Sequence, residues 1–84
     1  MNKDKVIIHG IYKHYKGNSY IVEDIGYHSE TGEKLVIYRG LYDDGKVWCR
    51  PYDMFLEEIE PDRQQKFGQK RRFELQHIES AVKD

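Results

Sequence analysis

The chain has 84 residues and a mass of 10.1 kDa, which is the size of one small domain. Its 14 lysine and arginine residues against 15 aspartate and glutamate residues leave a net charge of −1, which excludes a strongly basic nucleic-acid clamp and an acidic tail. No apolar run reaches the length of about 18 residues that a transmembrane helix needs, and no N-terminal stretch has the apolar length of a signal peptide, so we expect a cytoplasmic protein that does not enter a membrane.

The chain divides into three predicted parts. A flexible N-terminus is expected over residues 1–9, a β domain over residues 10–61, and a basic linker followed by a C-terminal helix over residues 62–84. The charge changes sign near the last boundary, from −3 over residues 1–60 to +2 over residues 61–84. The two parts therefore differ in composition as well as in pattern.

Short apolar segments separated by turn-forming residues predict strands in the β domain. Turns are expected at Gly17, Gly32 and Gly45, because glycine tolerates the positive φ that tight turns need. The predicted strands cover residues 11–15, 19–29, 34–41, 46–50 and 55–60, with a single helical turn at residues 52–55. Five short strands joined by tight turns predict an all-β fold, a small SH3-like β-barrel. Both faces of these strands carry apolar residues, so the pattern leaves open which face is inside.

The tail is predicted to be helical over residues 69–83, because Leu75, Ile78 and Val82 fall at helical spacing. An isolated helix of this length is marginal in water, so we expect it to pack on the barrel or on a second copy of the chain. A homodimer through this helix is thus one expectation. The basic residues from Arg63 to Arg72 are expected to dock on acidic side chains, within the chain or on a neighbour, rather than on a phosphate backbone.

Several short motifs follow one another along residues 10–60, and their order is more specific than any one of them. They are Gly10-x-Tyr12-x-His14-Tyr15-Lys16-Gly17, Tyr20-x-Val22, His28-x-Glu30-Thr31, Val36-x-Tyr38, Leu41-Tyr42, Trp48-x-Arg50-Pro51 and Met54-Phe55-x-Glu57. In this order they resemble a short bacterial family known only as domain-of-unknown-function family sixteen fifty-three. The resemblance implies a small all-β bacterial domain. It implies no activity, because the family has none assigned.

Aromatic and arginine side chains form the strongest candidate for a binding site. The candidate ligand-binding residues are Tyr12, His28, Glu30, Tyr38, Arg39, Tyr42, Trp48 and Arg50. Aromatic rings stack on nucleobases, and a guanidinium group binds phosphate or carboxylate through two donors. We therefore predict a non-catalytic binding module for a nucleotide-type small molecule or a nucleic-acid segment, with Trp48 or a tyrosine on the base and Arg39 or Arg50 on the phosphate. The same tyrosines would equally fill a small core with their hydroxyls at its rim.

Two other functions stay open at this point. An SH3-like module could hold a proline-rich or extended peptide, and an aromatic slot flanked by Asp43, Asp44 and Asp53 would favour a basic peptide. A small ribonuclease would need His28, paired with Glu30, and an arginine at one phosphate position. Ordinary turn chemistry explains the residues around His28 without any function.

No cofactor and no metal site are predicted. The single cysteine, Cys49, excludes an internal disulfide and a thiolate metal cage. The four histidines lack the spacing of structural zinc ligands.

Overall fold

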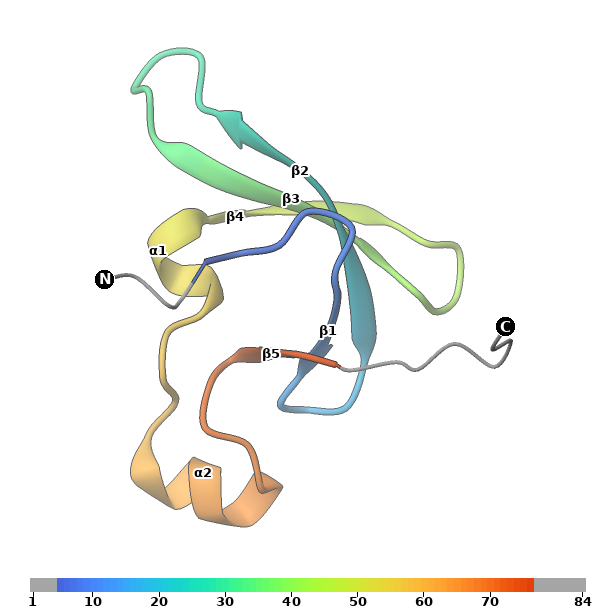
Figure 1. Cartoon of the computed structure of the whole chain (residues 1–84), viewed down its shortest axis with the longest axis vertical. Helices are drawn as coiled ribbons and strands as arrows, with labels where there is room; N and C mark the ends of the chain where they lie inside the picture. The colour runs from blue at the N-terminus through green and yellow to red at the C-terminus, as the bar shows by residue number, and fades with distance from the viewer. Residues whose placement is uncertain (1–4, 77–84) are drawn as a thin grey trace, which may run out of the picture.

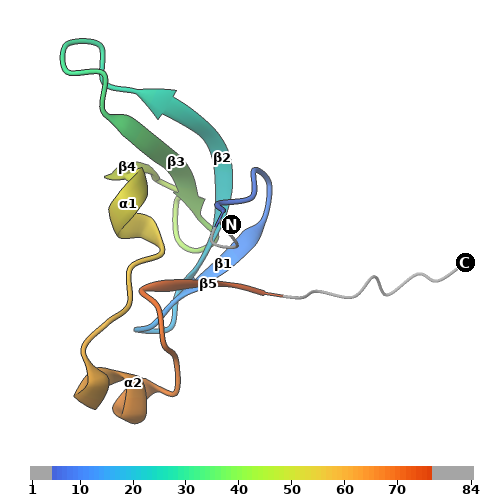
Figure 2. The ribbon, with the colours of Figure 1, turned by 60° about the vertical axis from the view of Figure 1, so that its left-hand side comes forward.

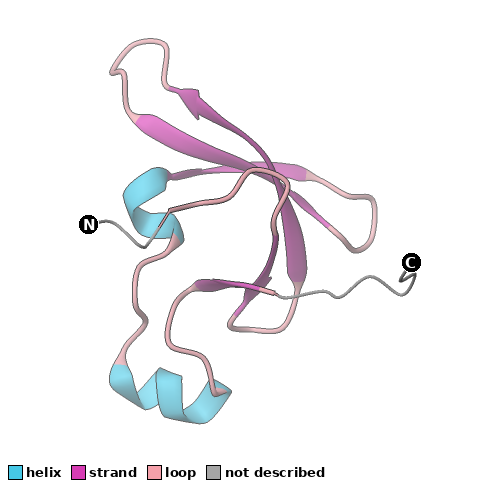
Figure 3. Ribbon diagram, in the orientation of Figure 1, coloured by secondary structure: helices cyan, strands magenta, loops and turns pink. Residues whose placement is uncertain are grey.

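Five antiparallel strands form one twisted sheet in the computed structural model, which describes residues 5–76 (Figure 1). The elements in chain order are β1 (Ile11–His14), β2 (Ser19–Tyr27), β3 (Lys34–Gly40), β4 (Val47–Pro51), α1 (Tyr52–Phe55), α2 (Pro61–Phe67) and β5 (Phe73–Leu75). The strand order in the sheet is β4-β3-β2-β1-β5, so the last strand returns to pair with the first. Both helices lie in the connection from β4 to β5 (Figure 3).

The first four strands form where turn residues allow hairpins, as predicted. Gly32 and Gly45 adopt positive φ values of 77° and 66° in the turns that flank β3. A bulge between Val22 and Asp24 interrupts the pairing of β2 with β3, and a bulge increases the local twist and bends the strand. Figure 2 shows the resulting curvature of the sheet from the side.

The described sheet is not closed into a barrel, because β4 and β5 are its two edges and do not pair with each other. The predicted closed barrel is therefore corrected to an open, curved sheet. The two edges nevertheless approach each other across the concave face, since the guanidinium carbon of Arg50 on β4 lies 5.7 Å from the ring centroid of Phe73 on β5. None of the helices within residues 5–76 has the length and apolarity to cross a membrane.

The last strand predicted for the β domain is wrong. Residues 55–60 do not form a strand, and only an isolated bridge joins Glu58 to Arg71. Pro61 begins α2, because proline suits the first turn of a helix, where its missing N–H loses no bond. This helix ends at Gly68, which has the left-handed φ of 69°.

The predicted helix over residues 69–83 is replaced in its first part by strand β5. Tyr12 of β1 pairs with Leu75, and His14 pairs with Phe73. The side chain of Gln69 is buried, and its amide nitrogen donates to the carbonyl of Lys13 at 2.8 Å, which holds the chain beside β1. Tertiary pairing thus overrides the helical spacing. Residues 77–83 of that prediction, and with them the expected helix-mediated dimer, lie outside the described residues.

The core lies on the concave face of the sheet. Its fully buried side chains are Tyr12, Val22, Val36, Phe55 and Phe73. Phe55 of α1 stacks on Phe73 of β5, with ring centroids 4.2 Å apart and planes 5° from parallel.

The strand register settles which residues share the concave face. Directly paired residues of antiparallel strands point to the same face. Tyr38 pairs with Trp48, and Val36 pairs with Arg50, so β4 presents Trp48 and Arg50 on the core side. Arg39 pairs with Val47 and lies on the opposite, convex face.

Candidate functional site

A group of aromatic and basic side chains lies on the concave face of the sheet, next to the buried core. We call this group the Arg50 face, and it consists of His14, Tyr20, Tyr38, Tyr42, Trp48 and Arg50. The strands β1 to β4 supply all of them except Tyr42, which follows β3. Strand pairing and direct ring contacts hold them together, so the position of each depends on the fold as a whole.

Arg50 is the cation of this face. Its Nε donates to the hydroxyl of Tyr38 at 3.4 Å, and its guanidinium carbon lies over the ring of Phe73 at 5.7 Å, within cation–π range. No carboxylate among residues 5–76 forms an ion pair with it. Most of its N–H donors are therefore available to an anion.

Trp48 lies two residues before Arg50 on the same side of β4. Its side chain is 44% exposed, although its cross-strand partner Tyr38 is buried. Lys46 continues the same alternation, because its carbonyl accepts a hydrogen bond from the N–H of Gly40 at 2.9 Å. A half-exposed indole ring is thus flanked along the strand by two cations.

Two tyrosine hydroxyls within hydrogen-bond distance form one side of the Arg50 face. The hydroxyls of Tyr20 and Tyr42 are 3.0 Å apart, and their rings meet edge to face. Burial, followed by the hydrogen bond to Tyr42, raises the pKa of Tyr20 to about 12. Tyr20 therefore stays protonated and offers a neutral hydroxyl rather than a charge.

Gly40 leaves the room that Tyr42 occupies. A Cβ at this position would lie 2.8 Å from Cε1 of Tyr42. We expect Gly40→Ala to displace Tyr42 from Tyr20 and to lower the free energy of unfolding by about 1–3 kcal/mol, measured by urea denaturation. Gly26→Ala is the matched control, since its Cβ would meet only the flexible end of Ile37, and its expected loss is below about 1 kcal/mol. Equal losses for the two variants would contradict this account.

His14 is a functional candidate that the sequence analysis did not single out. Its ring packs edge-on to Phe73 at 4.9 Å and stacks on Tyr15 at 4.5 Å. Its Nδ1 accepts a hydrogen bond from the backbone N–H of Lys16, so in the neutral ring Nε2 carries the proton. Burial first, and then the charges of Arg50, Arg72 and Lys16, lower the pKa of His14 to about 4. Residues two apart on a strand point to the same face, so the spacing of Tyr12 and His14 could have indicated that His14 shares the core side with Tyr12.

The depressed pKa of His14 makes the stability of the protein sensitive to acid. Below the ordinary pKa of 6.5 the unfolded chain binds a proton that the folded chain accepts only near pH 4. Stability is therefore lost as the pH falls from about 6.5 to about 4, and we expect a loss of about 1–2 kcal/mol after allowance for solvent screening. The measurement is urea denaturation at each pH for the wild type and for His14→Gln, which cannot titrate there. Parallel pH profiles for the two proteins would rule this out.

The structure does not bring Arg39 together with Arg50. Nε of Arg39 forms an ion pair with Glu23 at 2.7 Å on the convex face, and its Nη1 donates to the carbonyl of Gly45 at 3.0 Å. The two arginines therefore do not converge beside Trp48. Alternation within each strand was readable from the sequence, but the register between β3 and β4 was not.

His28 and Glu30 lie in the loop between β2 and β3, at the top of Figure 1. The Nδ1 atom of His28 accepts hydrogen bonds from the backbone N–H groups of Glu30 at 3.1 Å and Thr31 at 3.3 Å. His28 thus stabilises the turn with its side chain. Ile25 of β2 is level with Arg50, because both residues are in register with Val36. His28 follows Ile25 by three residues, which is about 10 Å along an extended chain. The arrangement that a ribonuclease would need is not formed.

Tyr12 belongs to the core rather than to the exposed rim. Its side chain is 1% exposed, and its hydroxyl accepts a hydrogen bond from the N–H of Ile7 at 2.9 Å. Burial raises its pKa. Tyr38 is also buried, but its hydroxyl reaches Arg50 and so remains part of the Arg50 face.

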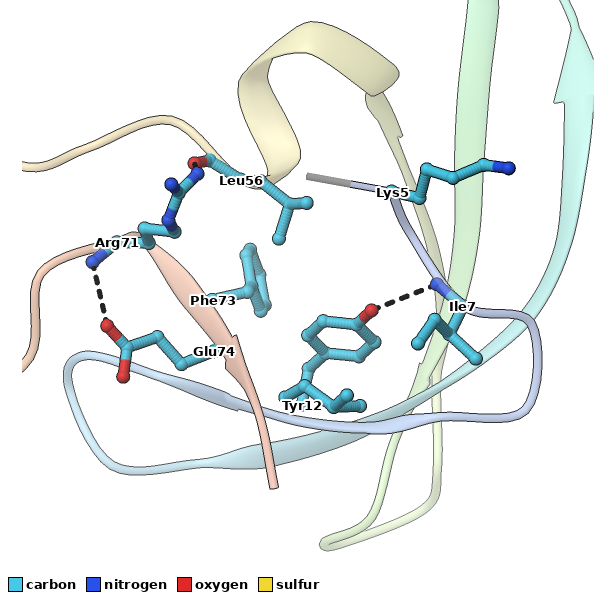
Figure 4. Close-up of a pocket in the computed structure, with 8 residues that line it drawn as sticks. Lys5, Ile7, Tyr12, Leu56, Arg71, Phe73 and Glu74 are labelled. Atoms are coloured by element: carbon cyan, nitrogen blue, oxygen red, sulfur yellow. Dashed lines mark hydrogen bonds between the residues drawn. The ribbon is translucent and has the colours of Figure 1, made fainter. Parts of the chain in front are cut away.

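A pocket of about 340 Å³ lies between the N-terminal segment, α1 and β5, and Phe73 is one of its lining residues (Figure 4). Tyr12 and Phe73 form its floor, and Lys5 and Arg71 lie at its rim. The guanidinium of Arg71 donates to the carbonyl of Leu56 at 3.0 Å. This bond joins the residue that follows α1 to the segment that leads into β5.

The basic residues of the tail dock on the acidic residues of the body, as expected. Lys70 pairs with Glu58, and Arg72 pairs with Glu57, each at 3.4 Å. Arg63 donates to the hydroxyl of Tyr15 at 2.9 Å. Among the described residues, 5–76, no group of three or more His, Cys, Asp or Glu side chains is placed to hold a metal ion.

Comparisons with known proteins agree with this fold. A family model described as "Protein of unknown function (DUF1653)" matches residues 10–75. The crystal structure of a DUF1653 protein from Bordetella bronchiseptica is similar over 93% of this chain and 95% of that chain, with 22% sequence identity and a TM-score of 0.66. This likeness shows a shared fold. No curated protein matches the sequence.

Proposed function

This chain belongs to the DUF1653 family, as the motifs of its first sixty residues indicated, and from the geometry of the Arg50 face we propose that it is a non-catalytic binding module. Its proposed ligand is a nucleotide-type small molecule or a nucleic-acid segment. The base stacks on Trp48, and the phosphate binds the guanidinium of Arg50. Lys46 adds a second cation on the same side of the strand.

One observation carries the proposal. Arg50 lies beside a half-exposed indole ring on the same strand face, with a single long hydrogen bond to Tyr38 and no ion pair within the described residues. A structural arginine is normally neutralised, as Arg39 is by Glu23 at 2.7 Å. A cation and an exposed aromatic ring side by side suit a ligand that is both anionic and aromatic.

We also propose that the curved sheet is an SH3-like barrel that is incompletely closed. The approach of Arg50 to Phe73 across the concave face supports this, because it brings β4 and β5 close together. The peptide-binding alternative has less support. Lys46 and Arg50, rather than aspartates, flank Trp48, and this arrangement favours an anion over a basic peptide.

A thermal-shift screen tests the proposed function. It covers mono-, di- and cyclic nucleotides, short single-stranded RNA and DNA, and proline-rich peptides. A ligand that binds only the folded state at about 100 times its Kd adds about 2.7 kcal/mol of stability and so raises Tm. We expect a rise with nucleotides or oligonucleotides that weakens with added salt, because phosphate contacts are screened. A rise in Tm with peptides alone would overturn the proposal. So would the absence of any rise in Tm across the whole screen.

A further inference from the structure

Strand β4 is an edge of the sheet, so alternate residues direct their backbone N–H and C=O groups away from β3, its only neighbour within the described sheet. The N–H of Gly40 donates to the carbonyl of Lys46, which sets the alternation of hydrogen bonds between β3 and β4. With the observed register, Trp48 and Arg50 direct their backbone groups toward β3. Val47 and Cys49 therefore direct their N–H and C=O groups outward, whereas Pro51 is the N-cap of α1 and its carbonyl accepts the first hydrogen bond of that helix.

These outward groups are unpaired within residues 5–76. No described backbone group bonds to the N–H of Val47 or of Cys49. The neighbouring side chains are also exposed: Val47 is 49% exposed, and Cys49 is an exposed free thiol. An apolar edge strand with free N–H and C=O groups is a template for another strand.

We propose that β4 pairs with β4 of a second copy of the chain, antiparallel and about a two-fold axis at Cys49. Cys49 then faces the partner's Cys49, and Val47 faces the partner's Pro51. Trp48 faces the partner's Arg50. The two sheets join into one continuous sheet across the axis.

The hydrogen-bonding groups of the strand complement themselves in this register. The N–H of Cys49 meets the carbonyl of the partner's Cys49, and the relation holds in both directions. Val47 lies opposite the partner's Pro51, whose carbonyl is held by its own α1, so the ladder of hydrogen bonds ends there. Proline has no N–H to offer, so it suits the end of such a pairing and would disrupt its middle.

The side chains favour the same register. Trp48 and the partner's Arg50 form a pair without mutual backbone hydrogen bonds, in which the Cα atoms are closest, about 4.5 Å apart. Arg50 makes no ion pair within the described residues and lies over the ring of Phe73, so the partner's Trp48 gives its guanidinium a second aromatic neighbour. The association joins a cation and an aromatic ring from different copies.

The interface is small, so the dimer forms only at high concentration. β4 has five residues, whereas a stable interface buries about 800 Å² on each partner. The inference does not depend on the proposed function, because the dimer is measured without a ligand. Failure of one therefore leaves the other standing.

Sedimentation equilibrium of the full chain with a reducing agent, from about 10 µM to about 1 mM, measures the association. Cys49→Lys and Cys49→Glu each place like charges directly opposite at the axis, so each variant alone is expected to associate at least about tenfold more weakly than the wild type. An equimolar mixture of the two variants places opposite charges there and is expected to associate at least as well as the wild type. Circular dichroism checks that both variants fold, since the replaced side chain is exposed.

Tyr27→Lys is the control, because this exposed residue lies on β2, away from the β4 edge, and its change is expected to leave the association unchanged. A wild type that stays monomeric over the whole range would overturn the inference. So would a dimer that persists in Cys49→Lys alone, because it would place the interface elsewhere.

Discussion

Phe73→Ala is expected to lower the free energy of unfolding by about 3–5 kcal/mol, the usual cost of deleting a fully buried aromatic ring. The ring of Phe73 is 1% exposed and stacks on Phe55. It also contacts the rings of Tyr20, Tyr38 and His14. A domain of this length has a total stability of roughly 4–12 kcal/mol, so the loss removes a large share of it and unfolds the variant if the wild type lies at the low end of that range.

Urea denaturation followed by tryptophan fluorescence measures this loss. Leu75→Ala is the matched control on the same short strand, because Leu75 is 43% exposed, and its expected loss is below about 1.5 kcal/mol. Phe73→Leu keeps part of the packing and provides a measurable intermediate value if the alanine variant does not fold. A Phe73 loss no larger than that of Leu75 would show that β5 is not needed for the core.

Trp48→Ala and Arg50→Ala are each expected to raise the Kd for a short single-stranded oligonucleotide by about 5- to 150-fold. This range corresponds to about 1–3 kcal/mol, which is the usual contribution of one stacked base. The loss of Arg50 removes a phosphate contact, so that variant is also expected to have a weaker dependence of Kd on salt. Fluorescence anisotropy at several salt concentrations measures both quantities.

Arg39→Ala is the matched control for these variants. It removes the same charge from the convex face, where Arg39 is already paired with Glu23. Its Kd is expected to stay within about twofold of the wild type, apart from a small change in net charge. Equal losses for Arg39→Ala and Arg50→Ala would indicate non-specific electrostatic binding instead of a site on the Arg50 face.

The sequence was most informative where local chemistry decides the structure. Glycines after polar residues marked the turns on both sides of β3, because few other residues adopt their positive φ. The strands between those turns form as predicted. The tail was misread because the partner that makes Phe73 part of a strand is His14, far away in the sequence. No local pattern contains that information.

The candidate site was predicted in part for the same reason. Trp48 and Arg50 were placed on one face by their spacing along a single strand. Arg39 was added to the site because the register of β3 against β4 cannot be read from either strand alone. His14 was missed because its surroundings come from β4, β5 and the residues before β5, which supply Arg50, Phe73 and Arg72.

The pairing of β1 with β5 has a consequence for the synthesis of the protein. Tyr12 is synthesised early, but its partner Leu75 follows only after four other strands and two helices have been made. Contacts between such distant positions slow folding, because a long loop must close before they form. Phe73 is made with that last strand, so until then the rings of Tyr20 and Tyr38 lack the aromatic ring that both of them contact in the folded protein. The nascent chain therefore exposes its aromatic cluster to other proteins until translation has passed β5.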